Sequence, residues 1–289
     1  MNKIYFSLII VATFFFLFPS CEIYNPEETV PSYIHIDKIN LVTNPSTQGT
    51  NSCKITDAWV FVDDQSIGAF ELPATFPVLF DGNHKITIKA GIKLNGIAMS
   101  RAIYPFYTEY SQNYNLVKDS VLIINPTISY NSSSIFQWRE SFEDGGTTIE
   151  KMSTSDTSID KTSDVGDVFE GSYSSVINLD ATRSTFEGQS STNFAIPLGK
   201  TVFLELNYKT NNTFNIGVIA YYNSSNTKRV IYGVNHSSEW NKIYINLTNQ
   251  IRDLYIPTNP PSYKIYFKVD KEIDVIQPKI FFDNIKLLY

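Results

Sequence analysis

The chain has 289 residues, of which 43% are hydrophobic and 14% aromatic, and its formal net charge is −6 at pH 7. A mildly acidic chain without clusters of Lys and Arg argues against nucleic acid as a partner, because neutralising phosphates requires grouped basic residues. It argues equally against electrostatic docking to anionic lipid. The length exceeds that of one typical domain and predicts two, each large enough for its own core.

The first residues have the pattern of an exported protein. Lys3 supplies a positive charge, residues 4–18 are almost entirely apolar, and the small residue Ser20 precedes Cys21. A basic start, an apolar core and a small-residue boundary predict a secretory signal peptide over 1–20 rather than a membrane-spanning helix. Cleavage there removes Lys3 and changes the formal charge from −6 to −7.

The cysteine at the cleavage point makes this segment resemble a bacterial lipoprotein signal. The resemblance implies that Cys21 is lipid-modified and holds the protein on outer-membrane lipid through an N-terminal acyl anchor. The alternative is an ordinary signal peptide or anchor helix that happens to contain a cysteine. Residues 21–32 form an acidic, proline-containing tether. Acidic residues after the cysteine resemble surface-exported lipoproteins of the Bacteroidetes type, which implies an outer-membrane, cell-surface location.

Residues 33–127 have a β pattern throughout and predict a small β-sandwich. Asp63-Asp64 predicts a turn, and Asn95-Gly96 predicts a hairpin that pairs 92–94 with 97–104. Residues 60–91 resemble PEGA-like surface domains, which implies a spacer or an adhesive module. Alternating or β-branched runs predict the strands, at 33–39, 55–62, 67–72, 84–92, 97–104 and 117–124.

Residues 128–136 are polar and predict a linker to a second domain over 137–289. Within it, residues 147–168 are rich in Ser, Thr and Asp and predict a long exposed loop. The other runs predict strands, at 171–179, 194–196, 202–208, 214–222, 230–234, 240–247, 263–269 and 279–287.

Four short motifs in this half resemble jelly rolls of the carbohydrate-binding-module type, a class that includes galactose-binding-like domains. They are Phe142-Glu143 at the start, Gly-Ser-Tyr-Ser at 171–174, the Trp-x-Lys step at 240–242 and Phe-Asp-Asn-Ile-Lys-Leu at 282–287. The expected fold class is therefore all-β, with an N-terminal sandwich and a C-terminal jelly roll. Fold alone does not fix the ligand.

The same resemblance implies a structural Ca²⁺ shared by Glu143 and Asp283, from the first and last strands of the jelly roll. Ca²⁺ takes six to eight oxygen ligands, so loop carbonyls and Asp167 or Asp180 would complete the shell. The alternative is that backbone N–H groups satisfy both carboxylates at the rim of the sheet.

Glycan binding requires aromatic faces beside a few polar groups. Tyr221 and Tyr222 are adjacent on a predicted strand, so one of them must face outward. Together with Tyr232 they are the candidate ligand-binding residues. Trp240 is expected to fill the jelly-roll core. The alternative for all these aromatic residues is that they simply build the two large β cores.

The sequence offers little for catalysis. The three histidines are not at metal-ligand spacing, and no nucleophile elbow or phosphate loop is present. Once Cys21 is lipidated, Cys53 is the only thiol, so no intrachain disulfide is expected, and Cys53 is best interpreted as a small buried residue. Asp63-Asp64 and Glu143-Asp144 could be read as glycosidase acids, which must face each other across a cleft.

The leading hypothesis is a non-enzymatic envelope lipoprotein that presents a glycan-binding or adhesive jelly roll. The alternative is a protein-interaction subunit of an outer-membrane uptake, secretion or assembly complex, with an outer-membrane protein as its partner. A glycoside hydrolase is the third hypothesis and depends only on analogy of fold.

Overall fold

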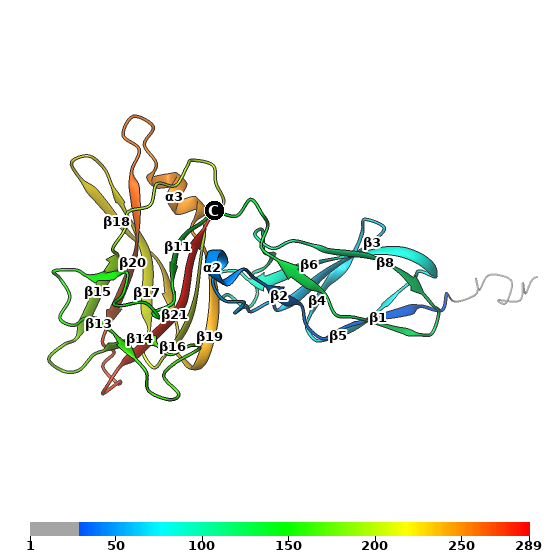
Figure 1. The fold of residues 1–289 in the computed structure, drawn as a ribbon, viewed down its shortest axis with the longest axis horizontal. Coiled ribbons are helices and arrows are strands. Elements are labelled where there is room, and N and C mark those ends of the chain that lie inside the picture. Colours follow the sequence, from blue (N-terminus) through cyan, green and yellow to red (C-terminus); the bar gives the residue numbers. More distant parts are fainter. Residues whose placement is uncertain (1–28) are drawn as a thin grey trace, which may run out of the picture.

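The structure is a computed structural model that describes residues 29–289. Cys21, the signal peptide predicted over 1–20 and most of the predicted tether lie outside the described residues. The described chain consists of strands and two short helices, α2 (Pro45–Gln48) and α3 (Thr248–Leu254). The predicted all-β fold with two sandwich domains is confirmed (Figure 1). Within the described part of the chain, no helix is long and apolar enough to cross a membrane.

Ten strands, β1 to β10, build the N-terminal domain. One sheet has the order β4-β3-β6-β7, with β8 beside the first half of β6. Opposite it lie the sheets β5-β1-β9 and β10-β2. The strands are β1 (Ser32–Ile36), β2 (Asn40–Val42), β3 (Asp57–Val62), β4 (Gln65–Glu71), β5 (Ala74–Val78), β6 (Gly82–Lys93), β7 (Arg101–Ile103), β8 (Tyr110–Leu116), β9 (Val121–Ile124) and β10 (Thr127–Ser129).

Alternation of side chains creates the core of this domain. Val60 and Val62 on β3 and Ile86 and Ile88 on β6 are completely buried, while the residues between them face away from the core. The turn predicted at Asp63-Asp64 joins β3 to β4, and both residues have positive φ angles of 49° and 66°. Aspartate tolerates this left-handed region better than most residues, so the turn follows from local chemistry.

The hairpin predicted at Asn95-Gly96 is longer than expected. Both residues have positive φ angles, of 56° and 71°, as the turn requires. The pairing of β6 with β7 begins only at Lys93 and Arg101, so the connection runs from 94 to 100. This connection contacts the second domain: the backbone N–H of Asn95 donates to the carbonyl of Tyr244 at 2.8 Å.

The C-terminal domain is a jelly roll of two packed sheets. The proximal sheet has the order β13-β14-β21-β16-β19 with β11 also beside β21, and it faces the N-terminal domain (Figure 1). The distal sheet has the order β12-β15-β20-β17-β18. The strands are β11 (Phe136–Glu140), β12 (Ile149–Lys151), β13 (Ile159–Thr162), β14 (Ser174–Asn178), β15 (Thr185–Ser190), β16 (Phe203–Thr210), β17 (Phe214–Tyr221), β18 (Asn226–Val234), β19 (Ser237–Asn246), β20 (Ser262–Asp270) and β21 (Lys279–Leu288).

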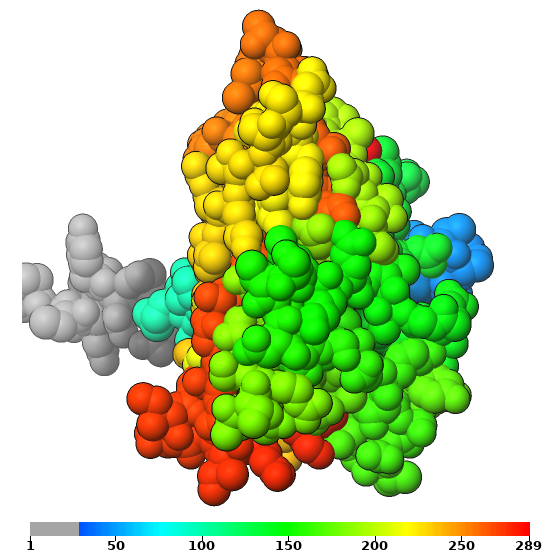
Figure 2. All heavy atoms as spheres, turned by 90° about the vertical axis from the view of Figure 1, so that its left-hand side faces the viewer, coloured from blue at the N-terminus to red at the C-terminus, as the bar shows by residue number. Residues whose placement is uncertain are grey.

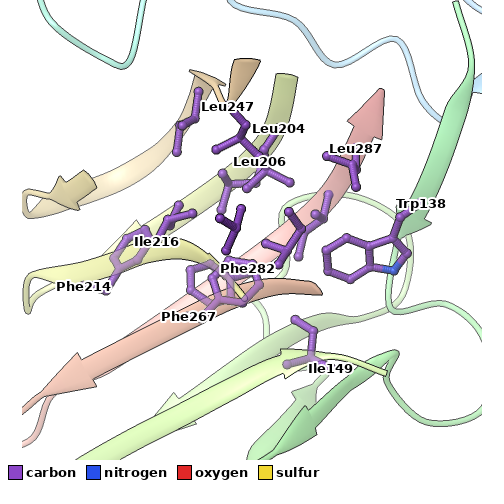
Figure 3. Close-up of a cluster of buried hydrophobic side chains, with 14 of the residues drawn as sticks. Trp138, Ile149, Leu204, Leu206, Phe214, Ile216, Leu247, Phe267, Phe282 and Leu287 are labelled. Carbon is purple, nitrogen blue, oxygen red and sulfur yellow. The ribbon is translucent and has the colours of Figure 1, made fainter. Parts of the chain in front are cut away.

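The jelly-roll core lies between these two sheets. Leu204 and Leu206 from the proximal sheet meet Phe214, Ile216 and Phe267 from the distal sheet, and all five side chains are completely buried (Figure 3). Trp138 from β11 closes one side of the same cluster, where its ring lies 5.8 Å from that of Phe194. Burial of about 150–250 Å² for each aromatic side chain makes this cluster the main source of the domain's stability.

Parts of the sequence interpretation are wrong. The stretch 147–168, expected to be an exposed loop, contains β12 and β13, which bury Ile149 and Ile159 in the core. The predicted strand at 194–196 is reduced to one isolated bridge between Phe194 and Tyr263. The strands β8 and β15 were not expected, because their sequences are dominated by polar residues.

A buried charged cluster joins the two domains. Glu205 on β16 is completely buried and lies 2.9 Å from the ammonium group of Lys242. From the N-terminal domain, the hydroxyls of Tyr104 and Tyr130 donate to the same carboxylate at 2.7 and 2.9 Å. Lys286 donates to the carbonyl of Thr50 at 2.7 Å. Burial opposes ionisation, but Lys242 and Lys286 outweigh it and lower the pKa of Glu205.

Apolar packing continues across the same junction. Phe203, Tyr244 and Leu288 of the jelly roll belong to the hydrophobic cluster of the N-terminal domain. The stretch 128–136, where the sequence predicts a linker, begins at Ile128 and includes Tyr130, and both are 3% exposed. The two domains are therefore held in a fixed orientation by shared burial and by hydrogen bonds.

Candidate functional site

The outer face of the distal sheet is the surface on which polar and aromatic side chains gather. It lies on the side of the jelly roll away from the N-terminal domain, where β17–β18 (yellow) and the β12–β13 region (green) are prominent (Figure 2). Because side chains alternate along a strand, the residues between those of the core point away from the core. They are Glu150, Glu187, Gln189, Ile219, Tyr221, Lys228, Lys264, Tyr266, Lys268 and Asp270. Of these, Glu187, Ile219, Lys264 and Tyr266 are themselves buried.

A chain of hydrogen bonds crosses this face. The hydroxyl of Tyr221 donates to Oε1 of Gln189 at 2.7 Å, and the amide of Gln189 donates to Glu150 at 2.7 Å. The ammonium group of Lys264 contacts the same oxygen of Glu150 at 2.5 Å. The hydrogen bond from Lys264 lowers the pKa of Glu150, so this carboxylate is ionised at neutral pH. Three strands thus hold Tyr221 in one orientation.

A second group of contacts centres on Glu187, which is 9% exposed. Lys228 donates to its carboxylate at 2.7 Å, and Thr154 donates at 2.8 Å. Burial opposes ionisation, but the hydrogen bonds from Lys228 and Thr154 outweigh it and lower the pKa of Glu187. Burial and the neighbouring Glu187 raise the pKa of Tyr266, so its hydroxyl remains protonated.

The two tyrosines of this face differ in accessibility. Lys228 lies 4.6 Å from the ring centroid of Tyr266, and Lys264 lies 5.9 Å from that of Tyr221. Both distances allow a cation–π attraction. Tyr266 is only 1% exposed, whereas Tyr221 is half-buried. Tyr221 is therefore the ring of this pair that an incoming ligand can contact.

The charges of this face balance. Three ammonium groups (Lys228, Lys264, Lys268) accompany three carboxylates (Glu150, Glu187, Asp270), and Lys268 lies 3.0 Å from Asp270. A balanced face with many donors and acceptors around one accessible ring suits a neutral ligand rich in hydroxyl groups. A strongly charged ligand would have to separate these ion pairs.

A glycine allows the strands below this face to approach closely. The pairing of β17 with β18 shifts register between Ile216 and Gly217. A Cβ atom on Gly217 would collide with the backbone carbonyl of Arg229. The missing side chain therefore lets β18 stay close to β17, which keeps Lys228 within reach of Glu187.

The other two predicted ligand-binding tyrosines lie elsewhere. Tyr222 packs against the jelly-roll core, and its hydroxyl donates to the carbonyl of Leu254 at 2.6 Å. Tyr232 also packs against the core and accepts a 2.6 Å hydrogen bond from the side-chain amide of Asn95 in the N-terminal domain. Of the three predicted tyrosines, only Tyr221 therefore lies on the distal face. The side chains of Tyr222 and Tyr232 point elsewhere.

The residues predicted to bind calcium both contact the chain near the start of β14. Glu143 accepts hydrogen bonds from the backbone N–H groups of Ser172 and Tyr173, each at 3.0 Å. Asp283 is 1% exposed and accepts from the Ser174 hydroxyl at 2.6 Å and the Asn284 N–H at 2.7 Å.

Burial raises the pKa of Asp283 to about 7, and within residues 29–289 this carboxylate forms no ion pair. A buried carboxylate without a cationic partner fits a metal ligand. In the same part of the chain, however, no group of three or more His, Cys, Asp or Glu side chains is arranged to hold a metal ion. Backbone carbonyls would have to supply the other oxygens, and a calcium site at Glu143 and Asp283 stays a prediction.

Other residues singled out in the sequence have structural contacts. Trp240, expected in the core, is half-buried outside it, with its ring 5.3 Å from that of Phe169. Burial raises the pKa of the Cys53 thiol, which makes it a poor nucleophile. His84 lies 2.6 Å from Asp63, whose carboxylate is also bound by the backbone of Lys85.

Sequence reasoning missed most of this face. Lys264, Tyr266 and Lys268 alternate with apolar core residues along β20, a pattern that was readable as one polar side of a strand. Glu187 and Gln189 alternate in the same way along β15. Both signals were overlooked because a strand's outer side identifies a site only once its neighbouring strands are known.

No protein-family model matches the chain, and no curated protein matches it. Solved structures show similarity at low identity. A carbohydrate-binding module from the β-sandwich superfamily, studied for promiscuous specificity, is 14% identical over 91% of this chain and 100% of that chain, with a TM-score of 0.41. The family 11 carbohydrate-binding module from Clostridium thermocellum, in complex with a β-1,3-1,4-mixed-linked tetrasaccharide, is 14% identical over 52% of this chain and 94% of that chain, with a TM-score of 0.35.

Fragments of enzymes are similar as well. The CBM22-1 and GH10 modules of endo-1,4-β-D-xylanase 10B from C. thermocellum, complexed with xylohexaose, are 15% identical to this chain, with a TM-score of 0.39. The match covers 53% of this chain and only 28% of the xylanase chain. The identities are 14–15% and the TM-scores are below 0.5, so these similarities carry no argument about ligand or function. Both must be inferred from the residues of the site itself.

Proposed function

We propose that this protein is a non-enzymatic lipoprotein of the outer membrane, anchored through Cys21 and exposed on the cell surface, whose jelly roll binds a neutral glycan. The observation that carries the proposal is the outer face of the distal sheet. There, Tyr221 is held by Gln189 among donors and acceptors whose charges cancel. Hydroxyl groups of a sugar can pair with these polar groups while a C–H face rests on the ring.

The orientation of the domains supports this role. The N-terminal domain covers the proximal sheet, so the distal face points away from the end of the protein at which the described chain begins (Figure 1). The buried contacts of Glu205 with Tyr104 and Tyr130 fix that orientation. A glycan-binding face held at the far end of a rigid spacer suits capture of polysaccharide outside the cell.

A glycan array tests the binding function. We expect the full chain to bind neutral oligosaccharides, and we expect Lys264→Met to lose this signal because Glu150 and the ring of Tyr221 lose their neighbour. Lys161→Met is the matched control, because Lys161 lies on β13 in the proximal sheet, over the ring of Tyr173. Silence of the wild-type protein on every glycan, or equal binding by both variants, would contradict the proposal.

Fractionation of cells tests the anchor. Cys21→Ser is expected to abolish incorporation of labelled fatty acid and to release the chain from the membrane fraction or leave it uncleaved. Cys53→Ser is the control and is expected to leave both properties unchanged, because Cys53 is a free thiol within the described residues. A Cys21→Ser protein that still partitions with membrane lipid would show that attachment has another cause.

A structural Ca²⁺ at the rim of the jelly roll is part of the same proposal. Asp283 and Glu143 would supply carboxylate oxygens, and what supports this role is that Asp283 is buried without an ion-pair partner among the described residues. The ion would tie the last strand, β21, to the opening of the domain.

A further inference from the structure

Exposed apolar side chains gather at the end of the N-terminal domain that lies farthest from the jelly roll. We define this N-terminal tip as residues 29–31, 79–82 and 117–120. Hydrogen bonds hold the three segments together: the Asp119 N–H donates to the carbonyl of Pro31 at 2.9 Å, and the Ser32 hydroxyl donates to the carbonyl of Phe80 at 2.7 Å. Each segment exposes one large apolar side chain, namely Val30 (49% exposed), Leu79 (67%) and Val117 (50%).

The apolar surface continues along one side of the domain. β9 is an edge strand that pairs only with β1 in its sheet, and its Val121 and Ile123 are 56% and 63% exposed. They lie beside Tyr33 and His35 of β1 in register, so they share one outward face. Exposed apolar side chains that gather in this way indicate a contact with another surface.

The N-terminal tip lies at the end of the domain that is nearest in the chain to Cys21, the predicted lipid anchor. β6 runs from Gly82 at the tip to Lys93 at the junction with the jelly roll, a distance of about 37 Å for a strand of this length. The tip is also where the described chain begins (Figure 1). Pro31 follows Cys21 by ten residue steps, which span at most about 36 Å. A lipid on Cys21 would therefore hold the tip close to the bilayer.

The charges of the N-terminal tip indicate which lipid headgroups it can contact. Asp81 and Asp119 outnumber Lys118, whose ammonium group lies 3.8 Å from Asp81. Anionic headgroups would be repelled rather than attracted. We propose that the N-terminal tip rests on a zwitterionic lipid surface, with Leu79 and Val117 in contact with the bilayer; this inference depends on the lipid anchor of the proposed function.

Site-directed fluorescence on the lipidated full chain tests this contact. An environment-sensitive label is attached after Leu79→Cys or Val117→Cys substitution in a Cys53→Ser background, and the protein is reconstituted into phosphatidylcholine vesicles. We expect emission at both positions to shift to shorter wavelength and to be quenched by spin-labelled lipid. Met99→Cys is the control, because Met99 is 91% exposed and lies in the loop at the opposite end of the same domain.

The outcomes separate this inference from the function on which it depends. If the protein fails to float with vesicles, the proposed lipid anchor on Cys21 is wrong, and so is the proposed contact of the N-terminal tip with lipid. If it floats but position 79 is quenched only by aqueous iodide, the tip does not touch lipid and the anchor stands. If position 79 is shielded from both quenchers, a protein or a second copy covers the tip, and the lipid contact is again wrong. Added salt is expected to leave the lipid quenching unchanged.

Discussion

The hydroxyl of Tyr104 donates a 2.7 Å hydrogen bond to the carboxylate of Glu205, and this bond joins the two domains where neither side chain reaches solvent. Lys242 lies 2.9 Å from the same carboxylate on the jelly-roll side. A buried carboxylate needs such partners, because an unpaired charge away from water is strongly destabilising. The junction therefore depends on tyrosines from one domain and on charges from the other.

We expect Tyr104→Phe to reduce the free energy of unfolding by about 1.5–3 kcal/mol, the usual contribution of a hydrogen bond to a charged group. Since Phe203 and Leu288 pack within the core of the N-terminal domain, the full chain is expected to unfold in one transition. Urea denaturation followed by fluorescence and by circular dichroism measures both properties. Tyr173→Phe, at a 39% exposed side chain, is the control and should change stability by less than about 0.5 kcal/mol. Two separate transitions would show that the junction is weak.

The strands of the jelly-roll core were predictable because their patterns are strong. Leu204, Leu206 and Tyr208 alternate with polar residues, as do Tyr263 and Ile265, and such alternation predicts a strand without knowledge of its partners. The region from 147 to 190 was not predictable in this way. There, Ile149 and Ile159 are isolated apolar residues in short strands, and they become core residues only through pairing with distant segments.

The site was less predictable than the fold. Tyr221 could be proposed from its neighbour Tyr222, since adjacent strand residues face opposite ways. Its partners Gln189, Glu150 and Lys264 come from three other strands, and their proximity follows from strand order rather than from any local pattern. Sequence reasoning also could not foresee that Tyr232 contacts the other domain.

We expect acid to weaken the contacts of the candidate face, because the pKa of Glu187 is lowered in the folded protein. Its pKa in the folded protein is lower than the 4.5 of a free glutamate. Its contribution to stability is therefore complete above pH 4.5 and is lost as the pH falls through the folded-state pKa. We expect Glu187→Gln to cost about 1.5 kcal/mol at neutral pH, with a difference from wild type that shrinks in acid. Denaturation at several pH values measures this difference.

The control for that experiment is Asp253→Asn. Asp253 forms an exposed pair with Arg229 at 4.0 Å, so its removal should change stability little at any pH. If the difference in stability between Glu187→Gln and wild type is the same at neutral and acidic pH, the ionised carboxylate of Glu187 does not contribute to stability.

Calcium should stabilise the jelly roll if the predicted site exists. We expect a chelator to lower the melting temperature of the full chain and added Ca²⁺ to restore it, because an ion that binds only the folded state stabilises it by mass action. Asp283→Asn is expected to remove this sensitivity, whereas Asp144→Asn, at an exposed acid beside Glu143, should keep it. A melting curve that is indifferent to chelator and to Ca²⁺ would leave both acids as rim residues satisfied by protein donors.

The most direct test of glycan binding is the affinity of the strongest array ligand for Tyr221→Ala, measured by titration calorimetry against wild type. Removing the one accessible ring should weaken binding at least tenfold, which corresponds to about 1.4 kcal/mol. Tyr173→Ala removes an exposed tyrosine outside the distal face and should bind like wild type. Circular dichroism and melting curves confirm that both variants are folded. If folded Tyr221→Ala binds the glycan as tightly as wild type, the distal face is not the binding site.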